Sequence, residues 1–162
     1  MNIIVFSDSH GDAESMRLII EKSNPDMVIY LGDGIGDILK LKKEFPQLRF
    51  EYVKGNCDII TQVPKEILIT VDGFTFLLMH GDKYGYRLDS DIVVEYAREK
   101  GATLFLHGHT HTPTIWTDSG ITVMNPGTVR NKPGKSYPTY GLIRTSEFGF
   151  SCKIMFAAYL LQ

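Results

Sequence analysis

Short groups of Asp, His and Asn residues recur along the sequence, each at or just after the end of a hydrophobic run. Carboxylate and amide oxygens are hard ligands and imidazole nitrogens suit transition metals, so this mixture favours a divalent cation. All five histidines lie in these groups, whereas random placement would scatter them. The groups are Asp8-Ser9-His10, Gly32-Asp33-Gly34, Gly55-Asn56-Cys57-Asp58, His80-Gly81-Asp82 and His107-Gly108-His109-Thr110-His111.

Each group taken alone also has a purely structural interpretation. Asp8 could cap a turn beside a surface histidine, and Asp33 could form an ordinary Asp-Gly turn. Asn56 could be a left-handed turn residue, and His80 could be a buried histidine with a structural hydrogen bond. Asp8 and His10, however, are two positions apart, and in an extended chain side chains with this spacing project to the same side. The prediction of one metal centre therefore depends on the groups taken together.

Two residues of these groups have features that suggest particular roles. Asp33 has a carboxylate, whose two oxygens can bridge two cations, and its flanking glycines let an ion approach the backbone closely. We therefore predict that Asp33 is a bridging ligand. His107 begins the last group, and we predict that it orients a neighbouring ligand, because histidine ligands are commonly fixed by hydrogen bonds of this kind.

The elements that must position these groups alternate between strand and helix in the first part of the chain. Continuous hydrophobic runs predict buried parallel strands, and the helical periodicity between them predicts two helices, the first capped by Asp12. Farther along, Asp72-Gly73 predicts a hairpin, followed by a helix with Ile92, Val93, Tyr96 and Ala97 inward. Short strands dominate from residue 114 onward. The predicted strands before that point are 2–6, 27–31, 49–53, 67–71, 74–79 and 104–106, and the third helix is 89–100.

Composition limits the classes of protein to consider. With 162 residues, 43% of them hydrophobic, and no linker or repeat, the chain is predicted to form one domain over residues 1–162. A net charge of -2 argues against a stable nucleic-acid complex, and no apolar run is long enough to predict a membrane partner. Two cysteines are too few for a disulfide framework, so we expect a reducing compartment, the cytoplasm. The sequence is compatible with a homo-oligomer.

The ordered motifs resemble those of the calcineurin-like metallophosphoesterase family. The resemblance rests on Asp8-x-His10, Gly32-Asp33, Gly55-Asn56, His80-Gly81 and Gly108-His109-x-His111, in this order. More narrowly, three segments are similar to those of the small bacterial and archaeal phosphodiesterases of that family. These segments are Asp8-Ser9-His10-Gly11-Asp12, Gly55-Asn56-Cys57-Asp58 and Asn125-Pro126-Gly127-Thr128. The resemblance implies an α/β fold of four layers, α-β-β-α, in which helices flank two mixed β-sheets.

The resemblance also implies two divalent metal ions, with Mn²⁺ expected and Ni²⁺, Fe²⁺ or Zn²⁺ as alternatives. Seven side chains would bind them, and three of these, Asp33, Asn56 and His80, are predicted to take part in catalysis. One ion would be bound by Asp8, His10, Asp33 and His111, and the other by Asp33, Asn56, His80 and His109. A hydroxide that bridges two ions can attack a phosphate ester in line, so we predict a phosphoesterase for a small substrate.

Cys57 departs from the family pattern and bears on the choice of substrate. In many relatives the residue after the Asn ligand is His, which is thought to protonate the leaving group. A thiol, with an ordinary pKa of about 8.5, is a poorer acid for this step at neutral pH. We therefore expect diesters with good leaving groups to be preferred over alkyl monoesters. The alternative interpretation of Cys57 is a small residue retained for packing.

Two other functions fit the same fold. A non-catalytic protein-interaction scaffold of the retromer type would be marked by missing metal ligands, and none is missing from this sequence. A nuclease would share the reaction but would need an extended basic or aromatic groove.

Overall fold

The computed structural model describes residues 1–60, 62–88, 90–132 and 137–157. Within them the chain forms ten strands, three α-helices and a 3-10 helix. The strands are β1 (Asn2–Phe6), β2 (Met27–Tyr30), β3 (Arg49–Tyr52), β4 (Glu66–Val71), β5 (Phe74–Met79), β6 (Leu104–Leu106), β7 (Thr114–Asp118), β8 (Ile121–Asn125), β9 (Thr139–Ser146) and β10 (Gly149–Phe156). The helices are α1 (Ala13–Ser23), α2 (Ile35–Glu44), α3 (Asp91–Glu99) and the 3-10 helix η1 (Asp82–Arg87).

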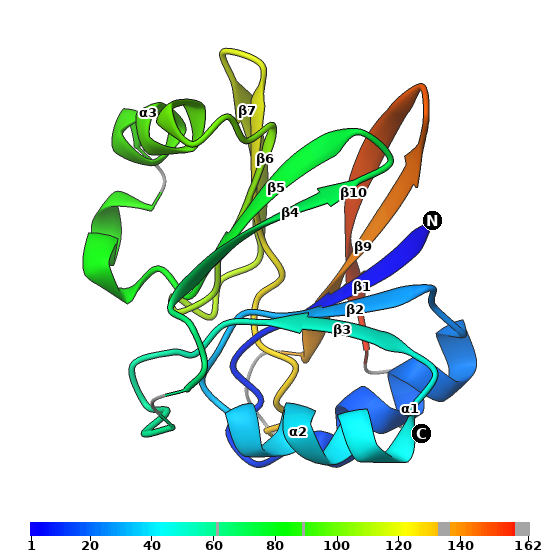
Figure 1. Cartoon of the computed structure of the whole chain (residues 1–162). Helices are drawn as coiled ribbons and strands as arrows, with labels where there is room; N and C mark the ends of the chain where they lie inside the picture. The colour runs from blue at the N-terminus through cyan, green and yellow to red at the C-terminus, as the bar shows by residue number, and fades with distance from the viewer. Residues whose placement is uncertain (61, 89, 133–136, 158–162) are drawn as a thin grey trace.

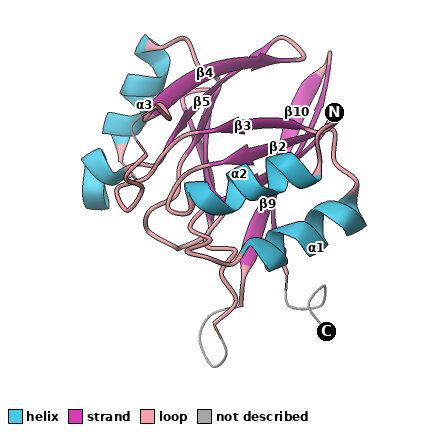
Figure 2. Cartoon of the chain, turned by 60° about the horizontal axis from the view of Figure 1, so that its bottom comes forward, coloured by secondary structure: helices cyan, strands magenta, loops and turns pink. Residues whose placement is uncertain are grey.

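The strands form two mixed sheets of five strands each. Sheet A has the order β10-β9-β1-β2-β3, in which β1, β2 and β3 are parallel and β9 is antiparallel to β1. Sheet B has the order β4-β5-β6-β8-β7, in which β5, β6 and β8 are parallel. Helices α1 and α2 cover the outer face of sheet A, and α3 lies beside sheet B (Figures 1 and 2). The predicted four-layer α-β-β-α fold is confirmed.

Side chains that alternate along β1 show how the layers are held together. Ile3 and Val5 enter the core between the sheets, where they join Phe76 of β5. Ile4 and Phe6 face the opposite way and pack with the inward side chains of α1 and α2. A strand whose two faces are both covered needs hydrophobic residues at every position, which explains the continuous apolar run in the sequence.

Local signals for a cap and a turn are confirmed. The Asp12 side chain accepts a hydrogen bond from Ser15 N at 3.1 Å and caps α1. Asp72 and Gly73 both have positive φ, 48° and 86°, and join β4 to β5. Positive φ at both central residues is what a two-residue hairpin turn with the twist of its strands requires.

The third helix differs from the prediction in its inward face. It spans Asp91–Glu99, and Asp89, the predicted start, lies outside the described residues. Its buried residues include Val94, whereas Ile92 is 43% exposed. The buried face of α3 is therefore formed by residues 93, 94 and 97. Ile92 precedes Val93 by one residue, so around the helix axis its side chain is turned about 100° away from this face. The sequence also gave no prediction of η1. None of the helices in the described residues is long and apolar enough to cross a membrane.

Candidate metal centre

The predicted ligand groups lie in loops that follow β1, β2, β3, β5 and β6. In each sheet these strands run parallel, so their carboxyl ends meet at one edge. The two sheets face each other, and all the groups come together where the two edges meet. The structure thus brings together all seven predicted ligands, Asp8, His10, Asp33, Asn56, His80, His109 and His111.

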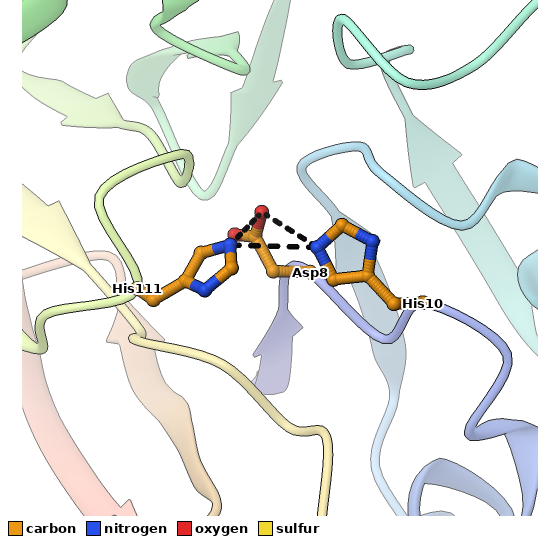
Figure 3. A group of neighbouring side chains, drawn as sticks. All are labelled: Asp8, His10 and His111. Carbon is orange, nitrogen blue, oxygen red and sulfur yellow. Dashed lines mark hydrogen bonds and ion pairs between the residues drawn. The ribbon is translucent and has the colours of Figure 1, made fainter.

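One half of the centre is formed by Asp8, His10 and His111 (Figure 3). Asp8 Oδ1 lies 3.1 Å from Nε2 of His111 and 3.9 Å from Nε2 of His10, and the two nitrogens are 3.4 Å apart. Asp8 Oδ1 is fully buried, and among the described residues it has no hydrogen-bond donor with good geometry. A buried anionic oxygen without a donor is costly, and a cation among these three atoms would stabilise it.

The other half is formed by Asp33, Asn56, His80 and His109. Asn56 Oδ1 lies 3.1 Å from both His80 Nε2 and His109 Nδ1, and Asp33 Oδ2 lies 3.3 Å from His80 Nε2. The ligand atoms of Asp8, Asp33 and His80 also lie within 4.8 Å of one another, which joins the two halves.

The tautomer of His80 supports a cation in this half. His80 Nδ1 lies 2.8 Å from the carbonyl oxygen of Leu31, which can only accept a hydrogen bond, so Nδ1 carries the proton. In the neutral ring Nε2 then has a lone pair that faces the amide oxygen of Asn56, and two acceptors at 3.1 Å repel each other. Either a proton on Nε2 or a metal ion between the two atoms removes this repulsion, so a metal ion can take the place of the proton and the donor set fits one.

Two glycines allow the carboxylates to approach the backbone. A Cβ atom on Gly55 would lie 2.1 Å from Asp33 Oδ1. A Cβ atom on Gly108 would lie 1.9 Å from Ser7 Oγ and 2.8 Å from Asp8 Oδ2. Any side chain at these positions would displace a predicted ligand, which explains why glycine precedes Asn56 and His109.

Left-handed backbone conformation is concentrated in the centre. Non-glycine residues whose backbone is in the left-handed region cost of order 1–3 kcal/mol each, and such residues cluster at functional sites. Our expectation that Asp8 and His10 converge because the chain is extended was wrong, since both residues have positive φ; the side chains converge because the loop turns sharply. The five predicted ligands with positive φ are Asp8 (56°), His10 (45°), Asp33 (61°), His109 (68°) and His111 (59°).

The carboxylates control the charge of the neighbouring imidazoles. Burial lowers the pKa of His80, but the ion pair with Asp33 and the charge of Asp8 outweigh burial and raise that pKa. The Asp8 carboxylate likewise raises the pKa of His111. Burial raises the pKa of Asp33, but His80 and the Cys57 N–H group hold it below its ordinary value. Protons therefore compete with a metal ion for these imidazoles more strongly than for an ordinary histidine, so metal affinity should fall as pH is lowered.

Cys57 lies at the exposed rim of the centre, where its Sγ atom is within 4.8 Å of ligand atoms of His10 and Asp33. The hydrogen bond with Asp33 raises the pKa of this thiol, so it stays protonated at neutral pH. His107 is buried, and burial lowers its pKa to about 4, so the ring is neutral. Its Nδ1 donates to the carbonyl oxygen of Gly108 at 3.1 Å, which places His107 behind the loop that carries His109.

Two supporting residues were missed from the sequence. Asp37, in the first turn of α2, accepts hydrogen bonds from Ser9 Oγ at 2.6 Å and Gly11 N at 2.8 Å, and so holds the loop on either side of His10. Asn125 donates to the carbonyl oxygen of Gly108 at 2.9 Å. Asn125 belongs to one of the three segments that resemble the small phosphodiesterases, but no local signal connects Asp37 to a loop 26 positions earlier.

Comparison with known proteins agrees with this geometry. The calcineurin-like phosphoesterase superfamily domain matches residues 1–147. The probable metallophosphoesterase YsnB of Bacillus subtilis is 30% identical over 146 residues, which cover 88% of this chain and 83% of YsnB. An archaeal phosphodiesterase of known structure has a TM-score of 0.68 at 24% identity, over 96% of this chain and 100% of that chain. Vps29 of Entamoeba histolytica, solved with Zn²⁺, has a TM-score of 0.71 at 20% identity, over 97% and 99% of the two chains.

The two-sheet sandwich and the loops that converge at its edge are those of a metallophosphoesterase. More specifically, the chain belongs to the calcineurin-like phosphoesterase superfamily, as the resemblance of its motifs implied. Membership implies divalent metal ions, and the side chains that would bind them are present and close together.

Proposed function

We propose that this protein is a cytoplasmic, divalent-metal-dependent phosphodiesterase for small phosphate esters, with Mn²⁺ as its metal. The observation that supports it most directly is the buried Asp8 Oδ1, which lies beside two imidazole nitrogens and has no good donor among the described residues. The free thiols of Cys57 and Cys152 agree with a reducing compartment. The proposed ligands are Asp8, His10, Asp33 and His111 for one ion and Asp33, Asn56, His80 and His109 for the other.

Two ions held there would lower the pKa of a water molecule and neutralise charge on the phosphoryl oxygens. The protein's own groups fix the donors for this purpose. Leu31 holds His80 in the tautomer that leaves Nε2 free, and the Cys57 N–H group fixes Asp33 Oδ1 at 2.8 Å. Asn56 supplies a neutral oxygen, which limits the negative charge that an anionic substrate would meet. We therefore assign the catalytic roles of this proposal to Asp33, Asn56 and His80.

The position of Cys57 supports the preference for diesters. Its thiol lies at the exposed rim of the centre, and Asp33 raises the pKa of this thiol, which makes it a weaker acid near neutrality. An aryl diester has a leaving group that departs without a proton. The leaving group of an alkyl monoester needs a proton to depart, so we expect such a substrate to react slowly.

Replacement of Cys57 by His is expected to change this preference. An imidazolium at the rim can protonate an alkoxide, and a positioned general acid contributes typically 10²–10⁴-fold. We expect Cys57→His to raise kcat/KM for an alkyl phosphomonoester by about 10- to 100-fold and to leave an aryl diester within about 3-fold. The measurement is the ratio of the two kcat/KM values at equal metal occupancy, with Cys57→Ser as the matched control. An unchanged ratio would show that Cys57 does not occupy the position of the acid.

The scaffold and nuclease alternatives require a direct assay. Vps29 has this fold and was solved as a complex with Zn²⁺, and metal binding by the present chain would not by itself demonstrate catalysis. The purified protein should be tested on aryl phosphodiesters, phosphomonoesters, cyclic nucleotides and DNA and RNA oligonucleotides, with Mn²⁺, Ni²⁺, Fe²⁺ and Zn²⁺ in turn. We expect metal-dependent turnover that is fastest for the aryl diester with Mn²⁺. No turnover with any bound metal would favour the scaffold, and faster cleavage of oligonucleotides would favour the nuclease.

A further inference from the structure

Asp58, which is not among the predicted ligands, joins two of the loops that carry them. Its carboxylate accepts four backbone hydrogen bonds from two separate segments. Oδ2 accepts from Asp33 N at 2.8 Å and from Gly55 N at 2.9 Å. Oδ1 accepts from Gly34 N at 2.9 Å and from Ile35 N at 3.0 Å. One side chain thus connects the loop after β2 to the loop after β3.

The loop after β2 needs such a partner because of its backbone. Gly32, Asp33 and Gly34 have consecutive positive φ values of 101°, 61° and 145°. The N–H groups of Asp33, Gly34 and Ile35 all point toward one concave site, of the kind that binds an anion. Helix α2 also begins here, and its N-cap, Gly34, has no side chain to satisfy the first N–H groups. The Asp58 carboxylate is the anion in this site and caps α2 from another segment.

The geometry of these two loops also determines the positions of two predicted ligands, Asp33 and Asn56. Asp33 lies inside the segment that Asp58 holds, and Asn56 directly follows Gly55. A second link, from Cys57 N to Asp33 Oδ1 at 2.8 Å, also joins the two loops. That link ends on the ligand carboxylate itself, whereas Asp58 holds only backbone. Asp58 can therefore maintain the separation of Asp33 and Asn56 without itself binding a metal ion.

We propose that Asp58 is a positioning residue that sets the separation of Asp33 and Asn56 and thereby the affinity of the metal centre. This inference rests on the proposed function, because it takes both residues to be ligands. Asp58→Asn preserves shape but replaces one acceptor oxygen by an NH₂ group. Two of the four backbone N–H groups then face a donor, whichever way the amide is turned. Groups that orient metal ligands typically contribute 10–100-fold to affinity.

The test compares Asp58→Asn with Asp72→Asn. Asp72 accepts a hydrogen bond from Thr145 Oγ1 at 2.5 Å in the turn at the start of β5, about 20 Å along the strand from His80. Both variants lose a carboxylate that accepts hydrogen bonds, so both should be less stable. Mn²⁺ binding by titration calorimetry, amide exchange of the metal-free proteins by NMR, and thermal unfolding are measured for both variants and the wild type.

We expect Asp58→Asn to weaken Mn²⁺ binding by about 10- to 100-fold and to accelerate exchange at Asp33, Gly34, Ile35 and Gly55. Asp72→Asn, which loses the ion pair with the N-terminal ammonium, should bind Mn²⁺ like the wild type. Equal Mn²⁺ affinity of Asp58→Asn and wild type, or unchanged exchange at the four amides, would overturn the positioning role. A wild-type protein that binds no divalent metal would instead overturn the proposed function, and faster exchange in Asp58→Asn would still support the role of Asp58 in holding the loops.

Discussion

Removal of divalent metal by a chelator is expected to reduce hydrolysis of an aryl phosphodiester to background, and added Mn²⁺ is expected to restore it. The reason is that the serine hydroxyls and the cysteine thiol closest to the centre among the described residues are not free to act as nucleophiles. Ser7 Oγ is buried and donates to Asp8 Oδ2 at 2.5 Å. Ser9 Oγ is held by Asp37 and Tyr30. The Cys57 thiol is protonated at neutral pH because Asp33 raises its pKa. An attacking oxygen must therefore come from water, which at its ordinary pKa of 15.7 is inert.

The measurement is kcat/KM before chelation, after exhaustive dialysis against chelator, and after return of each metal, with bound metal quantified at each step. The control is a far-ultraviolet circular dichroism spectrum of the metal-free protein, because most of the core lies far from the centre and the fold should persist. Full activity in protein with no measurable metal would rule out a metal-dependent mechanism. Restoration of activity by Zn²⁺ but not by Mn²⁺ would support the metal-dependent mechanism and would identify Zn²⁺, instead of Mn²⁺, as the metal.

The parts of the fold that could be predicted are those whose signals are local. The continuous apolar run of Met27 to Tyr30 predicts a strand covered on both faces, and Asp72-Gly73 predicts a turn from the φ values that those residues tolerate. The face of α3 was only partly predicted, because Ile92 and Val94 are equally hydrophobic and packing against sheet B decides which one is buried. The hydrophobicity of the two residues alone does not predict which of them is buried.

The convergence of the site was predictable for a topological reason. Parallel strands deliver their following loops to one edge, so residues as distant as Asp8 and His111 can meet without any local signal. The loop geometry was not predictable. Left-handed conformation at Asp8 has no local sequence signal, and three of the four hydrogen bonds of Asp58 come from a loop more than twenty residues earlier. Long-range polar contacts of this kind have no periodicity for a sequence pattern to reveal.

Replacement of Asp33 by Ala should cause the largest loss of any single predicted ligand. The ligand atoms of Asp33 lie close to those of Asp8 and His80 and also to those of His10 and Cys57, a position that agrees with the predicted bridging role. Partners that only orient ligands contribute 10–100-fold to metal affinity, so loss of a shared ligand should lower kcat/KM by more than about 100-fold. Bound Mn²⁺ should fall below two ions per chain.

The matched control is Asp26→Ala, which removes a carboxylate at the opposite end of β2. Asp26 accepts a hydrogen bond from Asn2 N at 2.6 Å and lies far from the centre, so activity and metal content should stay unchanged. A second readout separates loss of the ligand from general damage. In metal-free Asp33→Ala the pKa of His80 should fall below its wild-type value, because burial lowers this pKa and Asp33 is a main group that raises it. If Asp33→Ala retains two Mn²⁺ ions and normal turnover while the pKa of His80 falls, Asp33 controls the charge of its neighbour but does not bridge the metals.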